Sequence, residues 1–127
     1  MNSKVGIVVP TLGKRPEYLE ECLNSISKAV DDGNAAFVVL VSPSNFDASK
    51  YLAEGTVNLT VPDNGLGLAD AINSGFSAMP SQIEYINWLG DDDLLTPGSL
   101  SITSSYLDKN PRSVLVFGSC DYIDGVG

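Results

Sequence analysis

The chain has 127 residues, a length that fits one domain, and 43% of them are hydrophobic, enough to build a core. Sixteen Asp and Glu residues against seven Lys and Arg give a formal net charge of −9, which repels nucleic-acid phosphates and anionic lipid. Histidine is absent, so this chain by itself excludes a Ser-His-Asp triad, a histidine general base and a metal site that needs imidazole. We therefore expect no nucleic-acid partner, and a phosphate-bearing ligand would need a bridging cation.

The cysteines and the apolar runs indicate where the protein resides. Cys22 and Cys120 lie far apart and form no CxxC spacing, so we expect free, reduced thiols and a cytoplasmic location. The longest aliphatic and aromatic run, residues 37–41, is too short to cross a bilayer. The apolar stretch at residues 5–9 is too short for a signal peptide. The expectation is a soluble protein that is not transmembrane.

Strands and helices alternate along the first half of the chain. Residues 5–9 form a short β-branched run typical of a strand buried on both faces. Pro16 is expected to be the first residue of a helix, a position that favours proline because the N–H it lacks would have no partner there. Its apolar side chains recur at three- and four-residue steps: Leu19, Cys22, Leu23, Ile26 and Val30. Strands are expected over 37–41 and 57–61, the second near an edge, with a short helix over 47–53.

The second half continues this alternation. Residues 68–78 have the spacing of a helix with Leu68 and Phe76 facing inward. Residues 84–89 are expected to form a fourth strand, with Trp88 in the core.

A third helix and a fifth strand complete the predicted elements. Thr96 is an expected N-cap and Pro97 the first helical residue. The apolar side chains of this helix are Leu100, Ile102, Tyr106 and Leu107. Residues 113–117 are expected to form the fifth strand. Regular alternation of strand and helix predicts an α/β fold, with a mostly parallel sheet and helices on both faces.

Four segments are expected to meet at the edge of this sheet where ligands bind. In open α/β sheets that edge lies outside the carboxyl ends of the strands. The segments that follow the strands are 10–12, 42–44, 63–70 and 90–93. Functional residues are therefore sought there.

The acidic triplet Asp91-Asp92-Asp93 carries the strongest signal. Adjacent carboxylates repel one another unless a cation or hydrogen-bond donors offset their charge. Ligation by oxygen alone suits Mg²⁺ or Mn²⁺, held by one or two carboxylates and substrate phosphate. The alternative is a solvated loop in which Asp93 benefits from the dipole of the following helix. The place of the triplet, after a buried strand, favours a metal site.

Three further features at this edge carry weaker signals. The glycine-containing segment 65–68 precedes a helix and would present backbone N–H groups to an anion. Asp70 and Asn73 lie one turn apart at the start of that helix. Lys14 and Arg15 follow the first strand, where they would meet a diphosphate. Each of these features also fits an ordinary solvent-exposed loop.

Four segments, in order, resemble the family 2 glycosyltransferases of the GT-A fold, which are inverting nucleotide-diphospho-sugar transferases. The matching segments are 8–12 with 15–26, then 67–76, 88–100, and 117–118 with 121–124. They span nearly the whole chain. The resemblance implies a Rossmann-like GT-A sheet and a nucleotide-diphospho-sugar donor, a UDP-sugar in the first instance. The implied acceptor is an unidentified sugar, lipid or protein.

The resemblance also implies roles for individual residues. Those implied to bind the nucleotide-sugar are Pro10, Thr11, Leu12, Ser42, Asp70 and Asp91. Ser42 stands where the family has an Asp that reads the base. The metal is assigned to Asp92 and Asp93 because the DxD motif aligns in two ways. One alignment puts Gly90 first and Asp92 on the metal, which we rank first, and the other uses Asp91 and Asp93.

No catalytic residue is assigned. Inverting transfer needs a general base, and in the family this carboxylate lies beyond the matched region. We therefore expect residues 1–127 to form a single nucleotide-sugar-binding domain without the acceptor and base segment. The two functions that fit are a metal-dependent glycosyltransferase and a non-catalytic nucleotide- or metal-binding module. A receiver-type signalling domain would need an acidic pair after the first strand, where this chain has Pro10 and Thr11.

Overall fold

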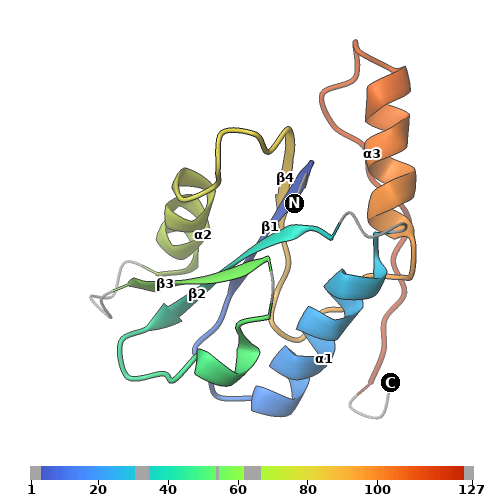
Figure 1. The fold of residues 1–127 in the computed structure, drawn as a ribbon. Coiled ribbons are helices and arrows are strands. Elements are labelled where there is room, and N and C mark those ends of the chain that lie inside the picture. Colours follow the sequence, from blue (N-terminus) through green and yellow to red (C-terminus); the bar gives the residue numbers. More distant parts are fainter. Residues whose placement is uncertain (1–3, 31–34, 54, 62–66, 125–127) are drawn as a thin grey trace.

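The computed structural model describes residues 4–30, 35–53, 55–61 and 67–124 (Figure 1). The elements in chain order are β1 (Val5–Pro10), α1 (Pro16–Lys28), β2 (Phe37–Pro43), the 3₁₀ turn η1 (Ser49–Tyr51), β3 (Thr56–Val61), α2 (Gly67–Ser77), β4 (Tyr85–Trp88) and α3 (Ser99–Lys109). The four strands form one sheet in the order β3-β2-β1-β4, and every pair is parallel. The α/β class with a parallel sheet is confirmed.

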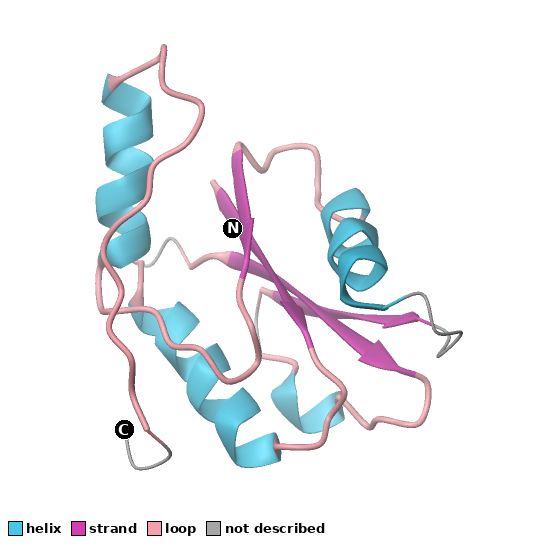
Figure 2. Cartoon of the chain, turned by 180° about the vertical axis from the view of Figure 1, so that it is seen from behind, coloured by secondary structure: helices cyan, strands magenta, loops and turns pink. Residues whose placement is uncertain are grey.

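The sheet is covered on both faces, by α1 on one and α2 on the other (Figures 1 and 2). Successive side chains of a strand point to opposite faces, so β1 contributes to two cores. Ile7 and Val9 pack with Leu19, Cys22 and Ile26 of α1. On the other face Val8 packs with Val39 and Val41 of β2 and with Ala71 and Phe76 of α2. The central strands β1 and β2 are therefore the most deeply buried part of the sheet, as their continuous apolar runs predict.

Two apolar side chains predicted to face inward are exposed. Trp88 is 42% exposed because β4 is an edge strand of four residues. Leu68 is 56% exposed because it lies in the first turn of α2, whereas the contacts of α2 with the sheet begin at Ala71. Both predictions were wrong for the same reason. A helical or alternating pattern identifies the apolar face of an element but not how far its neighbours extend over it.

The third helix begins two residues later than predicted, and Thr96 does not cap it. The N-cap of α3 is Gly98, whose φ of +74° is a left-handed conformation that favours glycine. The Gly98 N–H donates to the Lys28 carbonyl at the end of α1 (3.0 Å). The predicted apolar face is not buried either, since α3 has no buried residue.

The other end of α3 is held by polar contacts. Asp108 accepts hydrogen bonds from Lys4 Nζ (2.7 and 2.8 Å) and Tyr85 Oη (2.6 Å). The hydrogen bonds from Lys4 and Tyr85, in that order, lower the pKa of Asp108.

None of the helices in the described part of the chain has the length and apolar character that a membrane span needs.

The fifth strand predicted over residues 113–117 is absent. This segment is a loop that runs beside α3 in both views (Figures 1 and 2). Val114 is 97% exposed and Phe117 is 86% exposed. The residues have strand-forming side chains, but a strand also needs a partner, and no ladder hydrogen bond joins this segment to β4 in the described sheet.

Candidate functional site

The loops that follow β1 and β4 leave the sheet side by side. The Leu89 N–H donates to the Val8 carbonyl (2.9 Å), which continues the β1–β4 ladder one residue past β4. The Thr11 N–H donates to the Val41 carbonyl (2.9 Å) and does the same between β1 and β2. These bonds fix where both loops begin. The structure therefore brings the predicted residues Thr11 and Asp91 together, although they are 80 positions apart in sequence.

A buried hydroxyl orients the first carboxylate of the acidic triplet. Thr11 is only 7% exposed, and its Oγ1 donates to Asp91 Oδ2 at 2.7 Å. The same oxygen accepts the Gly13 N–H at 3.0 Å. Gly13 has a φ of +73°, so the turn that supplies this N–H favours glycine. Asp91 is consequently held in one orientation, with its side chain 17% exposed.

One guanidinium binds two carboxylates of the triplet. Arg15 Nη2 lies 3.1 Å from Asp92 Oδ2 and 3.6 Å from Asp91 Oδ1. The guanidinium carbon also lies 5.6 Å from the centre of the Tyr18 ring, within cation–π range. Asp93 is placed differently, because its N–H closes a turn on the Gly90 carbonyl at 3.0 Å. Asp91 and Asp92 therefore face a common cation, and Arg15 provides it in this structure.

The arrangement bears on the predicted metal site. Within the described residues no group of three or more carboxylate or thiol side chains converges on one point. Mg²⁺ usually takes one or two carboxylates and completes its shell with water and substrate phosphate. Asp91 and Asp92, both directed at one positive charge, match that smaller donor set. Asp92 and Asp93 as metal ligands remain a prediction.

Two side chains of helix α1 form hydrogen bonds with the backbone of the acidic loop. Cys22 Sγ donates to the Gly90 carbonyl at 3.4 Å, and Ser25 Oγ accepts the Leu95 N–H at 3.0 Å. Burial, followed by the negative charges of Asp91, Asp93 and Asp92, raises the pKa of Cys22 to about 12. The thiol is therefore neutral at physiological pH. Sequence reasoning placed Cys22 in the core but missed that it and Ser25 fix both ends of the loop.

The comparisons with known proteins show the family and the fold of the chain. The family described as Glycosyl transferase family 2 matches residues 6–127. The chain belongs to this family. Among curated proteins none matches the chain.

Two solved structures of TarS 1–349 from S. aureus, one of them in complex with UDP, share the fold of this family 2 domain. Each matches with 20% sequence identity and a TM-score of 0.71, over 85% of this chain and 33% of the TarS chain. The chain thus spans about a third of the length of these relatives. The likeness confirms the GT-A, Rossmann-like fold that the sequence motifs imply.

The remaining predicted donor-site residues of this family 2 domain differ in accessibility. Pro10 is the buried end of β1, whereas Leu12 is 65% exposed. Ser42 is 1% exposed, and its Oγ donates to Asn58 Oδ1 on β3 (2.9 Å). Its hydroxyl is therefore occupied by β3 in this structure. Asp70 is exposed in the first turn of α2.

Two further parts of the predicted edge are not joined to the β1 and β4 loops by the contacts that the structure describes. Within the described ranges no hydrogen bond or ion pair joins Asp70 to Thr11 or to the acidic triplet. Gly65 and Leu66 of the glycine-containing segment lie outside the described residues, as does Asp63. Lys14 is exposed. The part of the site that the structure assembles is thus formed by the β1 and β4 loops.

Proposed function

We propose that the chain is the donor-binding part of an inverting glycosyltransferase that uses a nucleotide-diphospho-sugar and Mg²⁺ or Mn²⁺. The observation that carries this proposal is that Asp91 and Asp92 both pair with the Arg15 guanidinium, at the carboxyl edge of a parallel sheet. Membership of the family and the UDP complex of TarS support a nucleotide donor, with UDP the first to test. The acceptor is a sugar, a lipid or a protein.

Each residue of the assembled site has a distinct part in this proposal. Asp92, with Asp91 or Asp93 beside it, would hold the cation. The bound cation would neutralise the diphosphate as the leaving group departs. Thr11 keeps Asp91 in position through its 2.7 Å hydrogen bond. Arg15 would have to release the carboxylates for a cation to bind them, and it would then be free to contact diphosphate oxygens.

The second candidate is a module that binds nucleotide and cation without transferring a sugar. The observation that favours it is that two of the acidic side chains at this edge already form ion pairs. Asp91 and Asp92 pair with Arg15, and neither Asp91 nor Asp92 is left as a free base. An assay of sugar transfer and donor hydrolysis separates the two candidates, because only the enzyme releases the nucleotide diphosphate.

Thermal unfolding with nucleotides tests donor binding directly. The chain is unfolded with UDP, GDP, CDP or dTDP, each in the presence of Mn²⁺ and again with EDTA. A ligand at about 100 times its Kd stabilises the native state by about 2.7 kcal/mol. For a domain of this size that raises Tm by several degrees. We expect a rise with one nucleotide that EDTA removes.

Substitution of the acidic loop locates the cation. Asp92→Asn removes a negative charge at nearly constant shape, so the metal-dependent rise in Tm should disappear while Tm without ligand changes little. Asp121→Asn, at an exposed position outside the site, is the matched control. Loss of the rise in Asp93→Asn alone would favour the second alignment of the motif. An unchanged rise in both variants would overturn the proposed cation site.

The cellular location is also proposed. Cys22 and Cys120 are both free thiols. Free thiols persist in the reducing cytoplasm, so we propose that the domain works there.

A further inference from the structure

The loop that follows β2 packs against the loop that follows β1. Phe46 belongs to the first of these loops, and its N–H donates to the Pro43 carbonyl at the end of β2 (3.2 Å). Gly13 belongs to the second and has a φ of +73°. The Phe46 ring fills the space that a side chain at position 13 would need, since a Cβ atom there would lie 2.7 Å from Phe46 Cε2 and 3.0 Å from Phe46 Cγ. The ring therefore lies directly against the Gly13 backbone.

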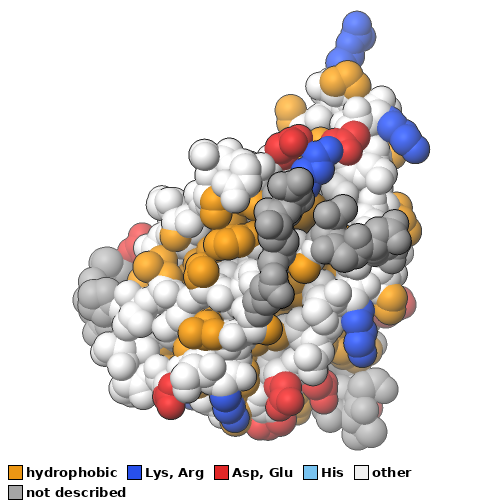
Figure 3. Space-filling model, in the orientation of Figure 1, with side chains coloured by type: hydrophobic (Ala, Val, Ile, Leu, Met, Phe, Trp, Pro, Cys, Tyr) orange, Lys and Arg blue, Asp and Glu red, His pale blue; other side chains and the backbone are white. Residues whose placement is uncertain are grey.

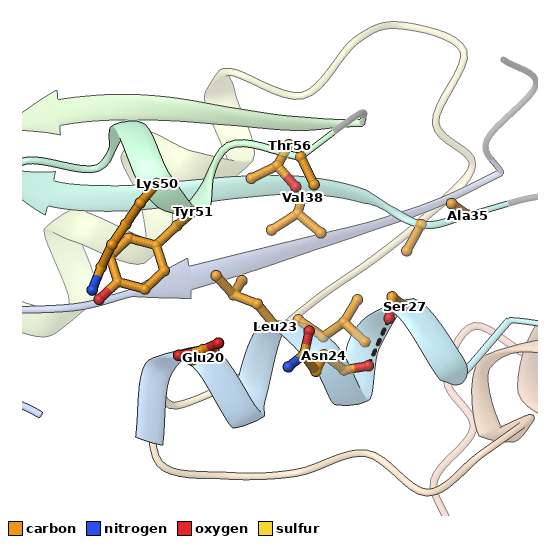
Figure 4. A pocket seen from close by; sticks show the side chains of 12 residues that line it. Glu20, Leu23, Asn24, Ser27, Ala35, Val38, Lys50, Tyr51 and Thr56 are labelled. Carbon is orange, nitrogen blue, oxygen red and sulfur yellow. Dashed lines mark hydrogen bonds between the residues drawn. The ribbon is translucent and has the colours of Figure 1, made fainter. Parts of the chain in front are cut away.

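Phe46 is itself held by a second ring. The Phe46 and Tyr51 rings stack with centroids 5.7 Å apart and planes 20° apart. Tyr51 is buried and extends from η1 toward α1, with the Lys50 side chain beside it and the Lys50 ammonium 4.8 Å from the ring centre (Figure 4). Phe46 also packs against the buried cluster on the α1 face of the sheet. The ring that covers Gly13 is thus anchored on the core.

The covered turn presents the Gly13 N–H in one direction. This N–H donates to Thr11 Oγ1 at 3.0 Å. A threonine hydroxyl has three staggered positions about χ1, and the hydrogen bond favours the one observed. The Thr11 backbone is already fixed, because its own N–H donates to the Val41 carbonyl in continuation of the β1–β2 ladder. The rotamer of Thr11 consequently depends on the turn at Gly13.

The Thr11 rotamer in turn decides how Asp91 is presented. Thr11 Oγ1 donates to Asp91 Oδ2 at 2.7 Å, and Asp91 Oδ1 is the oxygen that lies 3.6 Å from Arg15 Nη2. Without the hydrogen bond from Thr11, the carboxylate would be free to rotate. A carboxylate that is already ordered loses less entropy when a cation binds. The contacts therefore connect the β2 loop to the β1 loop, and the β1 loop to the acidic loop after β4.

We propose that Phe46 is a positioning residue: by holding the Gly13 turn, it keeps Asp91 oriented for a divalent cation. It acts through the Thr11 hydroxyl and does not bind the cation itself. This inference rests on the proposed function, because the cation is the one proposed to bind the acidic loop. The β2 loop, whose expected role was base recognition by Ser42, thereby also sets the geometry of a carboxylate on a different strand.

Calorimetric titration of the full chain with Mn²⁺ tests this proposal. Phe46→Ala removes the ring, so the Kd of Mn²⁺ should rise roughly two- to tenfold, as for the loss of one hydrogen bond. Phe46→Leu leaves Gly13 partly uncovered, should raise the Kd in the same direction, and replaces Phe46→Ala if that variant does not fold. Phe76→Ala is the matched control, because it removes the same ring from the other face of the sheet, where Phe76 packs with Val8. It should lower Tm without changing the Kd. An unchanged Kd at position 46, or an equal rise in Phe76→Ala, would overturn the proposal.

A double-mutant cycle separates positioning from general support of the fold. Thr11→Val removes the hydroxyl through which Phe46 is proposed to act, at nearly constant side-chain shape, and should raise the Kd of Mn²⁺ by itself. In that background Phe46→Ala should cause no further rise. A residue that only stabilises the fold would weaken binding by the same factor in both backgrounds, since independent effects add. Additive effects of the two substitutions would therefore contradict the proposal.

Hydrogen exchange of the Gly13 amide reports on the turn without any cation. In Phe46→Ala this amide should exchange about tenfold faster relative to the Val39 amide of β2, because local opening of the turn becomes easier. Phe76→Ala should leave the ratio as it is in the unmodified chain. An unchanged ratio in Phe46→Ala would show that Phe46 does not hold the turn. If the unmodified chain binds no Mn²⁺, the proposed function fails, and the exchange of Gly13 still decides whether Phe46 controls the turn.

Discussion

Arg15 occupies the position where a divalent cation is proposed to bind. Its guanidinium pairs with Asp91 and Asp92, and half of its side chain is exposed. A cation that binds these carboxylates must displace it. Exposed ion pairs contribute about 0.2–1 kcal/mol, so the competition is modest.

Replacing Arg15 should therefore strengthen the binding of a divalent cation in the absence of nucleotide. For Arg15→Gln we expect the Kd of Mn²⁺, measured by titration calorimetry, to fall by about two- to fivefold. Arg112→Gln, at an exposed position on another part of the surface, should leave the Kd unchanged. An unchanged or higher Kd in Arg15→Gln would show that Arg15 does not compete for the site.

The raised pKa of Cys22 makes the domain lose stability as the pH rises into the alkaline range. The pKa of Cys22 is about 12 in the native state because of burial and the nearby carboxylates, against 9.0 for an ordinary thiol. Above pH 9 the unfolded chain releases a proton that the native state keeps. The contribution of this thiol to stability is thus fully present below pH 9 and is lost as the pH rises toward 12.

The size of this effect is at most about 1.4 kcal/mol for each pH unit. Urea unfolding of the unmodified chain and of Cys22→Ser between pH 8 and pH 11 measures it. Serine does not ionise in this range, so the variant should lose less stability per pH unit than the unmodified chain, whatever its stability at pH 8. Equal slopes would mean that Cys22 ionises in the native state near its usual pKa.

At the scale of elements, the packing of α2 on β1 depends on one glycine. Gly75 is buried, and a Cβ atom at this position would lie 2.5 Å from Val8 Cγ1 and 3.2 Å from Val41 Cγ2. Both neighbours are branched side chains of the central strands, which have little freedom to move away. Glycine at this position allows the helix axis to lie close to the sheet.

Gly75→Ala should consequently destabilise the domain. Alanine gains about 1 kcal/mol of helix propensity over glycine, but overpacking costs about 1–3 kcal/mol. We expect a net loss of up to about 2 kcal/mol in the free energy of unfolding in urea. Ser77→Ala, at an exposed position of the same helix, is the control and should be neutral or slightly stabilising. A gain in stability for Gly75→Ala would show that α2 can shift away from β1.

The sequence predicted the buried elements better than those at the edge. The run at 5–9 and the stripe of α1 were confirmed, because an element that is buried by its neighbours carries the pattern of its own burial. Trp88 and residues 113–117 were wrong, because their apolar character does not specify whether a neighbour covers them. The difference between the two groups is the distance from the centre of the sheet.

The candidate site divides in a similar way. That Asp91, Asp92 and Asp93 follow a strand at the carboxyl edge could be predicted from the order of the elements. The hydrogen bond from Thr11 to Asp91 and the pairing of Arg15 with two carboxylates could not. These contacts depend on how the β1 and β4 loops approach each other across the parallel sheet, and neither loop encodes the conformation of the other.

At the scale of the whole molecule, the net charge disfavours self-association, whereas the exposed apolar side chains favour it. Acidic groups gather at the lower edge of Figure 3, where α1 begins. The large apolar side chains that are exposed on β4, α3 and the segment after α3 are Ile86, Trp88, Ile102, Tyr106, Val114, Leu115, Phe117, Tyr122 and Ile123. Exposed apolar surface of this kind favours association, whereas the net charge of −9 keeps copies apart.

Self-association should therefore increase with salt. Salt shortens the range of charge repulsion and leaves apolar attraction in place. Sedimentation velocity of the 127-residue chain should show larger species at high than at low ionic strength. Phe117→Asp should reduce them, whereas Leu52→Asp, an exposed position next to η1, should not. A chain that stays monomeric at every salt concentration would contradict this prediction.

The position of β1 has a consequence for synthesis on the ribosome. Gly6 of β1 pairs with Phe37 of β2 on one side and with Ile86 of β4 on the other. Translation proceeds at about 5–20 residues per second, so β4 emerges seconds after β2. During that interval β1 can pair with β2, and β2 with β3, but the second edge of the buried strand β1 is bare. An unpaired strand edge can pair with another chain, so we expect the nascent domain to be most prone to aggregation until the ribosome has delivered β4.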